Sequence, residues 1–311
     1  MSVVYKALDA RLGRFVALKL PLEQFHEDGC GFERLQQEAR TASALNHPGI
    51  CTIYDMDADR GQPFIVMEFI EGQTLREKLS EGPQTLLKTL RYGVQIAEAL
   101  GNAHARGIVH CDINPSNLFI TRDDRVKLLD FGIARFLSAS RVTARTLTGT
   151  VSYMSPEQAR LRTVDARSDI FSVGIVLYEM LTCRRPFRGA NVRDTIQQVI
   201  FKDPCALRAI NPKIPVAVEN AVNRCLRKSA QDRYQTVEEL RLELLKVRLR
   251  KSAFSLNGRF TVGDLPAPVA VKTRMVKKSY ANNGHEPVVE QCVNRTICID
   301  SGCVSEGSSL C

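Results

Sequence analysis

The first seventy residues alternate between short strand-like segments and one helical segment. Apolar and polar residues alternate on both sides of the turn-forming stretch Asp9–Gly13, which predicts a β-hairpin. Further along, apolar residues recur at helical spacing and stop before Asn46-His47-Pro48-Gly49, a sequence that breaks helices. The predicted segments are a hairpin of Val3–Leu8 and Arg14–Leu20, a helix at Phe32–Leu45, and strands at Cys51–Met56 and Pro63–Phe69. This pattern predicts a small sheet with one helix.

Beyond Gly72 the pattern changes to longer helical segments. Apolar residues at helical spacing predict a long helix ended by Gly107, an apolar helix after it, and three further helices. These helices are Thr85–Arg106, Asp169–Leu181, Arg193–Ile200, Val216–Leu226 and Val237–Leu249. Two short strands, Leu118–Thr121 and Val126–Leu129, are predicted between the first two helices. A small β-rich lobe followed by a helical lobe predicts an α+β fold with a cleft between the lobes.

These changes of pattern divide the chain into three parts. Residues 1–70 are predicted to form the small lobe, and residues 71–250 the large lobe. In residues 251–311 the periodicity disappears, and Ser, Gly, Asn and Pro become common. We therefore expect a disordered tail after the large lobe.

The composition excludes several classes of protein. The chain has 311 residues, of which 44% are hydrophobic and 25% charged, so it can bury a substantial core. Its longest mainly apolar stretch, around residues 170–178, is shorter than the roughly 20 residues of a membrane span. The ten cysteines are scattered without a C-x-x-C pair, which favours a reducing compartment and a cytoplasmic protein. The net charge of +9 is not accompanied by a nucleic-acid recognition motif, so no nucleic-acid partner is expected.

Four short motifs follow one another in a fixed order along the predicted elements. They are Val16-Ala17-Leu18-Lys19, His110-Cys111-Asp112 with Asn117, Asp130-Phe131-Gly132, and Ser155-Pro156-Glu157. Together they resemble the eukaryotic-like protein kinase family over residues 1 to about 250. The segments Asn46-His47-Pro48 and 153–158 are most similar to bacterial serine/threonine protein kinases. The resemblance implies the two-lobed protein-kinase fold.

The resemblance also implies how ATP and a metal ion would be held. A lysine on an inner strand needs a partner, and the resemblance pairs Lys19 with Glu38 to grip the α- and β-phosphates of ATP. Asp112 would orient the acceptor hydroxyl, while Asn117 and Asp130 would ligate Mg²⁺, which prefers oxygen ligands. The alternatives are a surface lysine on an edge strand and Asx residues that cap turns.

An adenine pocket is implied by further positions. Met67 would guard the pocket, and the backbone of Glu68 and Ile70 would bind the base. Three other residues would enclose the adenine, although plain core residues would look the same: Val4, Ala17 and Phe119.

Other residues of the motifs are expected to support the structure. By resemblance, His110 and Phe131 pack between the lobes, and Asp169 holds the backbone of the loop around Asp112. Glu157 is expected to pair with the distant Arg233.

The sequence departs from the family pattern in three places. It starts at Met1-Ser2-Val3-Val4, where the family is midway through its Gly-x-Gly-x-x-Gly loop, so the small lobe is expected to be incomplete through truncation or a misassigned start. Asn114 replaces the lysine usually found two residues after the catalytic aspartate, and losing such a charge can cost on the order of 10²–10³ in rate. Cys111 replaces the arginine that meets a phosphorylated activation loop.

The region of the activation loop contains several threonines. Because Cys111 cannot clamp a phosphate, phosphorylation of this loop is expected to matter less than in the family. The candidate phosphorylation sites are Thr143, Thr146 and Thr148. Thr150 resembles the threonine that contacts the catalytic aspartate in serine/threonine-specific members.

Two functions remain open from the sequence. Retention of Lys19, Glu38, Asp112, Asn117 and Asp130 favours a kinase that transfers the ATP γ-phosphate to serine or threonine hydroxyls of proteins, with Mg²⁺. The missing glycine-rich loop and catalytic-loop lysine favour a pseudokinase, a nucleotide-binding or scaffolding module with little catalysis.

Overall fold

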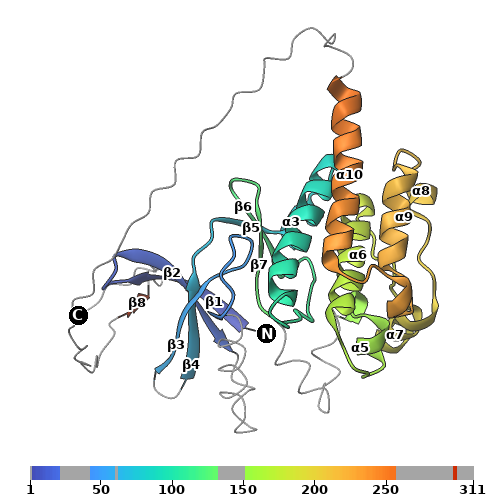
Figure 1. Cartoon of the computed structure of the whole chain (residues 1–311). Coiled ribbons are helices and arrows are strands. Elements are labelled where there is room, and N and C mark those ends of the chain that lie inside the picture. Colours follow the sequence, from blue (N-terminus) through green and yellow to red (C-terminus); the bar gives the residue numbers. More distant parts are fainter. Residues whose placement is uncertain (1, 22–42, 60–61, 132–150, 257–296, 300–311) are drawn as a thin grey trace, which may run out of the picture.

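The structure, a computed structural model of the chain, describes residues 2–21, 43–59, 62–131, 151–256 and 297–299. A small β-rich lobe and a larger helical lobe lie next to each other (Figure 1). This arrangement confirms the predicted α+β fold with two lobes.

The small lobe is built on one antiparallel sheet with the strand order β3-β4-β2-β1-β8. Its strands are β1 (Ser2–Asp9), β2 (Arg14–Pro21), β3 (Ile53–Asp59), β4 (Gln62–Glu68) and β8 (Ile297–Ile299). Ala7, Val16, Leu18 and Val66 meet in a buried cluster on one face of this sheet. Side chains alternate between the two faces of a strand, so Ala17 and Lys19 project from the other face.

The turn between β1 and β2 is fixed by its own residues. The Asp9 carboxylate accepts hydrogen bonds from the backbone N–H groups of Arg11 and Leu12, both at 3.2 Å. Gly13 has φ = +63°, which side-chain-bearing residues rarely adopt, and its N–H donates to the Asp9 carbonyl at 2.8 Å. This turn sets the register that places Val4 opposite Lys19.

The large lobe packs helices around a short second sheet. The sheet consists of β5 (Gly72–Thr74), β6 (Leu118–Thr121) and β7 (Val126–Leu128). The longer helices are α3 (Leu86–His104), α6 (Ala166–Thr182), α7 (Val192–Phe201), α9 (Val216–Cys225) and α10 (Val237–Leu256). The shorter ones are α2 (Leu75–Ser80), α5 (Pro156–Ala159) and α8 (Leu207–Ile210), with 3₁₀ turns η3 (Val151–Tyr153) and η4 (Ala230–Asp232).

Helix α6 forms the centre of the large lobe. Every residue from Ser168 to Leu181 is buried, which explains why this segment reads as apolar on all sides. The Asp165 side chain caps the first turn by accepting from the Arg167 N–H. Helices α3 and α10 pack against each other and against α6 (Figure 1). A helix that is buried over this length can hold a side chain such as Asp169 in a fixed position.

Within the described residues, each predicted strand and helix is found, and the differences concern short elements and ends. β5, α2, α5 and α8 were not predicted, because three to six residues give too few positions for a periodic pattern. α10 continues to Leu256, seven residues beyond the predicted end. Within the segment expected to be a tail, the structure describes the end of α10 and β8. The helix predicted at 32–45 lies almost entirely outside the described residues.

Backbone and side-chain bonds join the two lobes behind the cleft. The Cys51 N–H donates to the Leu128 carbonyl at 2.9 Å, and the Leu128 N–H donates to the Gly49 carbonyl at 2.8 Å. The Glu68 carboxylate at the end of β4 forms an ion pair of 2.7 Å with the Lys127 Nζ on β7. These contacts fix β7, and the residues that follow it, against the small lobe.

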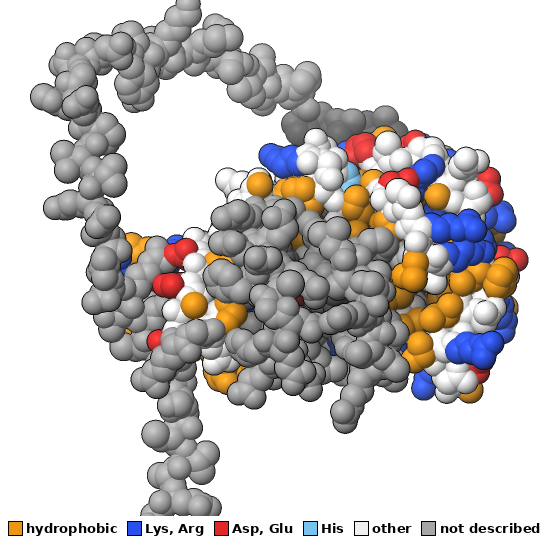
Figure 2. Space-filling model, turned by 90° about the horizontal axis from the view of Figure 1, so that it is seen from below, with side chains coloured by type: hydrophobic (Ala, Val, Ile, Leu, Met, Phe, Trp, Pro, Cys, Tyr) orange, Lys and Arg blue, Asp and Glu red, His pale blue; other side chains and the backbone are white. Residues whose placement is uncertain are grey.

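The surface of the large lobe carries many basic side chains. Viewed from below, these lie between apolar and uncharged ones on the described surface (Figure 2). Such a mixed surface agrees with the net charge of +9. No helix in the described part of the chain is long and apolar enough to cross a membrane.

Candidate active site

An ion pair between Lys19 and Asp130 connects the small lobe to the large lobe. Lys19 lies on β2 with its side chain only 11% exposed, and its Nζ is 2.7 Å from Asp130 Oδ1. Asp130 follows β7 and has φ = +42°, a left-handed conformation that orients its side chain away from the strand direction. Its carboxylate is 35% exposed and can therefore bind a ligand as well as Lys19. Glu38, the partner implied by the resemblance, lies outside the described residues.

The loop of residues 110–117, called the catalytic loop below, holds the carboxylate of Asp112 between two amides. Asn114 Nδ2 donates to Asp112 Oδ1 at 3.1 Å, and Asn117 Nδ2 donates to Asp112 Oδ2 at 2.9 Å. Both amides also donate to the Asp112 backbone carbonyl, at 3.0 and 2.9 Å. Asn114 Oδ1 in turn accepts from the Ser116 N–H at 2.9 Å. The orientation of Asp112 is therefore fixed before any substrate binds.

Asp169 of α6 anchors the catalytic loop from below. Its carboxylate is almost fully buried and accepts the backbone N–H groups of His110 and Cys111 at 2.8 and 2.9 Å. His104, at the end of α3, contacts the same carboxylate at 2.8 Å. Gln158 of α5 donates to the Cys111 carbonyl at 2.8 Å. The expected role of Asp169 is confirmed, whereas the contacts of His104 and Gln158 were not expected from the sequence.

His110 connects the catalytic loop to Asp130. The ring is fully buried, and its Nε2 lies 2.8 Å from the Leu129 carbonyl. The Leu129 N–H donates to the Asn117 carbonyl at 2.9 Å. Both backbone polar groups of Leu129 are thus bonded to the catalytic loop, which fixes the position from which Asp130 extends. The His110 ring also lies 4.6 Å from the Phe131 ring, which confirms a packing role for both residues.

Cys111 contributes no charge to the site. Burial, together with the neighbouring carboxylates of Asp169 and Asp112, raises the pKa of its thiol to about 12. The thiol therefore stays protonated at neutral pH and is neither a nucleophile nor a cation. Its φ of +65° belongs to the sharp bend by which the loop turns over Asp169.

The residues implied for an adenine pocket lie on both sides of the cleft. Ala17 is buried and pairs with Met67 across β2 and β4, whereas Val4 on β1 is 54% exposed. Phe119 is half-buried on β6, in the sheet of the large lobe. The Glu68 N–H donates to the Thr52 carbonyl at 2.9 Å, and the Glu68 carbonyl accepts from the Cys51 thiol at 3.9 Å.

The expected pair of Glu157 and Arg233 is confirmed. The guanidinium donates to both carboxylate oxygens at 2.8 Å, and Arg233 is only 1% exposed. Burial alone would raise the pKa of Glu157, but the hydrogen bonds and charge of Arg233 outweigh it and lower that pKa. Arg233 also donates to the backbone carbonyls of three residues: Arg167, Arg227 and Lys228. This buried pair ties α5, α6 and η4 together around the base of the site.

The side-chain oxygens of Asn117 and Asp130 suit a metal ion such as Mg²⁺ that also binds phosphate oxygens. In the described part of the chain no three His, Cys, Asp or Glu side chains gather as an all-protein metal site. Asn117 uses its amide nitrogen to hold Asp112, so its amide oxygen is left for another partner. Mg²⁺ typically binds one or two protein oxygens and completes its shell with water and phosphate. Asn117 and Asp130 fit that requirement.

Comparison with known proteins agrees with this geometry. The sequence profile of the family described as protein kinase domain matches residues 1–244. A probable serine/threonine-protein kinase of Streptomyces coelicolor is 40% identical over 252 residues, which cover 78% of this chain and 37% of that protein. The serine/threonine-protein kinase PknB of Mycobacterium tuberculosis is 39% identical over 255 residues, covering 79% and 41%. The chain thus spans about two fifths of the length of these relatives.

Proposed function

Since the chain belongs to the protein kinase family, we propose that it transfers the γ-phosphate of ATP to serine or threonine hydroxyls of proteins. The observation that carries this proposal is the assembly of Asp112, Asn117 and Asp130 with Lys19 at one cleft. Leu129 links these residues: its backbone is hydrogen-bonded to His110 and Asn117 of the catalytic loop, and Asp130 is the next residue in the chain. The family uses ATP and a divalent metal, and for this chain we propose Mg²⁺.

In the proposed reaction, the residues of the cleft position the reactants and balance charge. Lys19 lies beside Asp130 and would contact the phosphates from the small lobe. Bound Mg²⁺, held by Asn117 and Asp130, would neutralise negative charge on the phosphates. Asp112 would accept the proton of the substrate hydroxyl while the hydroxyl oxygen bonds to the γ-phosphorus and the bond to ADP breaks. The two amides that donate to the Asp112 carboxylate would keep it in one orientation toward that hydroxyl.

The base of ATP would lie between the lobes. We propose that Met67 limits the depth of the pocket and that the backbone of Glu68 and Ile70 binds the adenine edge. The residues proposed to enclose the ring are Val4, Ala17 and Phe119. Roles for Glu38 with the phosphates and for Thr150 beside Asp112 rest on the resemblance alone, because both lie outside the described residues.

The compartment and partner follow from the reaction. A kinase consumes ATP, and the scattered cysteines favour a reducing environment. We therefore propose the cytoplasm as its place of action and proteins, not nucleic acids, as its partners.

Radiolabel transfer tests the proposed function directly. The full chain is incubated with γ-labelled ATP and a generic protein substrate, with Mg²⁺ or with Mg²⁺ removed by a chelator. We expect label on serine or threonine, with none after chelation. ATP binding measured by calorimetry without any transfer would contradict the proposal and indicate a pseudokinase instead.

Replacing Lys19 by methionine is expected to separate catalysis from stability. The substitution removes a charge next to the phosphates, so we expect turnover to fall about a hundredfold or more. The free energy of unfolding should change by less than about 1 kcal/mol, because the remaining Asp130 carboxylate is accessible to water. Turnover is measured with peptide and ATP, and stability by urea denaturation. Lys6→Met, on the exposed part of β1, is the control and should leave turnover unchanged. Equal turnover in both variants would remove Lys19 from the proposed site.

Replacing Asn114 by lysine is expected to raise turnover about tenfold or more. A cation beside Asp112 would stabilise the negative charge of the transferring group, which the neutral amide does not. A small loss of stability is expected, since the Ser116 N–H loses its acceptor, although Ser116 is exposed and water can replace it. Asn114→Met has similar length without charge and serves as the control. A lysine variant no faster than the parent at saturating ATP would show that this charge does not limit the reaction.

A further inference from the structure

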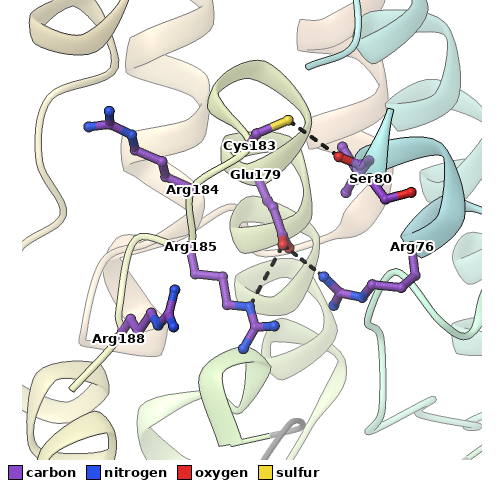
Figure 3. A pocket seen from close by; sticks show the side chains of 8 residues that line it. Arg76, Ser80, Glu179, Cys183, Arg184, Arg185 and Arg188 are labelled. Atoms are coloured by element: carbon purple, nitrogen blue, oxygen red, sulfur yellow. Dashed lines mark hydrogen bonds and ion pairs between the residues drawn. The ribbon is translucent and has the colours of Figure 1, made fainter. Parts of the chain in front are cut away.

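A cavity of about 630 Å³ lies between α2 and the C-terminal end of α6 (Figure 3), and none of the residues proposed to bind ATP lines it. Its charged lining consists of four arginines and one glutamate: Arg76, Glu179, Arg184, Arg185 and Arg188. These side chains carry an excess of three positive charges. Arginines that lie this close together repel one another, and a bound anion would reduce this repulsion.

The single carboxylate of the cavity is already fully engaged. The Glu179 side chain is 6% exposed and forms ion pairs with Arg76 at 3.0 Å and with Arg185 at 3.7 Å. Tyr153 also donates its hydroxyl to Glu179. Figure 3 shows Arg76 and Arg185 approaching Glu179 from opposite sides. Glu179 therefore positions two arginines and cannot neutralise the others.

Two arginines of the cavity are left for an external anion. Arg184 and Arg188 are exposed, and no side chain or carbonyl among the described residues accepts from their guanidinium groups. Arg184 points away from Glu179 in Figure 3. Guanidinium groups bind carboxylates and phosphates through paired hydrogen bonds, which makes such a cluster a typical anion site.

The cavity adjoins the residues that would perform phosphoryl transfer. The backbone N–H of Arg76 donates to the backbone carbonyl of Pro115, a residue of the catalytic loop, at 3.0 Å. Tyr153, which bonds to both Arg76 and Glu179, ends η3 and lies two residues before the α5 cap Ser155. Helix α5 in turn reaches the catalytic loop through Gln158 and the Cys111 carbonyl. A protein substrate whose serine or threonine hydroxyl contacts Asp112 would thus pass close to the arginine cavity.

We propose that this cavity binds an anionic side chain, acidic or phosphorylated, that neighbours the acceptor hydroxyl in the protein substrate. The inference rests on the proposed function and specifies its substrate class. An anionic side chain would balance the excess charge and bring the acceptor to Asp112. The chain is then a kinase that selects serine or threonine residues in an acidic or already phosphorylated sequence.

Peptide binding and phosphorylation together test this proposal. One set of peptides places aspartate, phosphoserine, alanine or lysine at each position from four before to four after a single serine. A second, fluorescent set carries alanine in place of that serine and reports binding by anisotropy without catalysis. At one or two positions we expect aspartate or phosphoserine to bind at least about tenfold more tightly than alanine, with lysine weaker still. The aspartate and phosphoserine arms distinguish a carboxylate from a phosphate as the preferred anion.

The variant Arg184→Ala/Arg188→Ala keeps the Glu179 network and should abolish the preference for the anion. Arg193→Ala, an exposed arginine of α7 that does not line the cavity, is the matched control and should keep the preference. Arg188→Glu should shift the preference toward the lysine peptides. All proteins are treated with phosphatase first.

The result separates this inference from the proposed function. Equal binding of anionic and neutral peptides by the parent, or an unchanged preference in the double variant, would overturn the inference even if serine is phosphorylated. A preference in the binding arm without any transfer would support the anion site while contradicting the proposed kinase activity.

Discussion

Replacing Asp130 by asparagine is expected to lower the rate of phosphoryl transfer by about a thousandfold or more, equivalent to about 4 kcal/mol of activation free energy. The carboxylate lies 2.7 Å from the Lys19 Nζ, and the Asp130 side chain is 35% exposed to solvent. An asparagine of the same shape keeps one oxygen but loses the full negative charge that would hold Mg²⁺ next to the phosphates. Turnover is measured with saturating ATP over a series of Mg²⁺ concentrations.

The same substitution at a nearby exposed aspartate provides the control. Asp123 lies in the turn between β6 and β7, and Asp123→Asn should leave turnover unchanged. Denaturation curves should show that both variants remain folded. A rate for Asp130→Asn within about threefold of the parent would remove Asp130 from the metal site and leave its contact with Lys19 as a structural ion pair.

Replacing Arg233 by alanine is expected to lower the free energy of unfolding by about 3–5 kcal/mol, and Tm by roughly 6–20 °C. The substitution leaves the mostly buried Glu157 carboxylate without its cation and three backbone carbonyls without their donor. Unpaired buried charge is among the few causes of losses of this size. The measurement is urea denaturation at neutral pH, followed by thermal unfolding.

A partly exposed arginine that also forms an ion pair with glutamate provides the comparison. Arg241 pairs with Glu238 on the surface of α10, and Arg241→Ala should cost less than about 1 kcal/mol. The double variant Glu157→Gln/Arg233→Met should be more stable than Arg233→Ala, because no unpaired charge is left. Equal losses for Arg233→Ala and Arg241→Ala would contradict a structural role of the buried pair.

The pH dependence of stability gives an independent check of the same pair. Arg233 lowers the pKa of Glu157 in the folded protein, so the unfolded chain binds the proton more readily. The stabilisation is therefore fully present above the ordinary glutamate pKa and is lost as the pH falls through the lowered value. In Arg233→Ala this part of the acid sensitivity should disappear, so the gap between parent and variant should narrow in acid.

The sequence alone determined the elements that depend on local patterns. Alternation at Val16–Lys19 and the turn at Asp9–Gly13 act within a few residues, so the hairpin could be predicted from them. The same holds for α6, whose apolar residues continue over four turns. The short α2 and α5 lack such a repeat, and their local signals are confined to the start of each helix, such as the capping boxes at Thr74 and Ser155.

The order of the motifs also predicted which residues would lie together in a candidate site. Asp112 with Asn117 and Asp130 were expected in one site, and the structure shows them joined through Leu129. The roles of Asp169 and of the pair Glu157–Arg233 were also expected, and both are confirmed.

Only the tertiary structure decided how these residues are held and what surrounds them. The contact of His104 with Asp169 joins positions 65 residues apart, and that of Arg76 with Glu179 joins positions 103 apart. No pattern within one segment predicts such contacts, because they arise when α3, α2 and α6 pack against one another. The sequence likewise did not predict that four arginines line one cavity beside the catalytic loop. One of them lies on α2, and the other three lie in the segment after α6. Charge density depends on distances in space, and those are set by the packing of the helices.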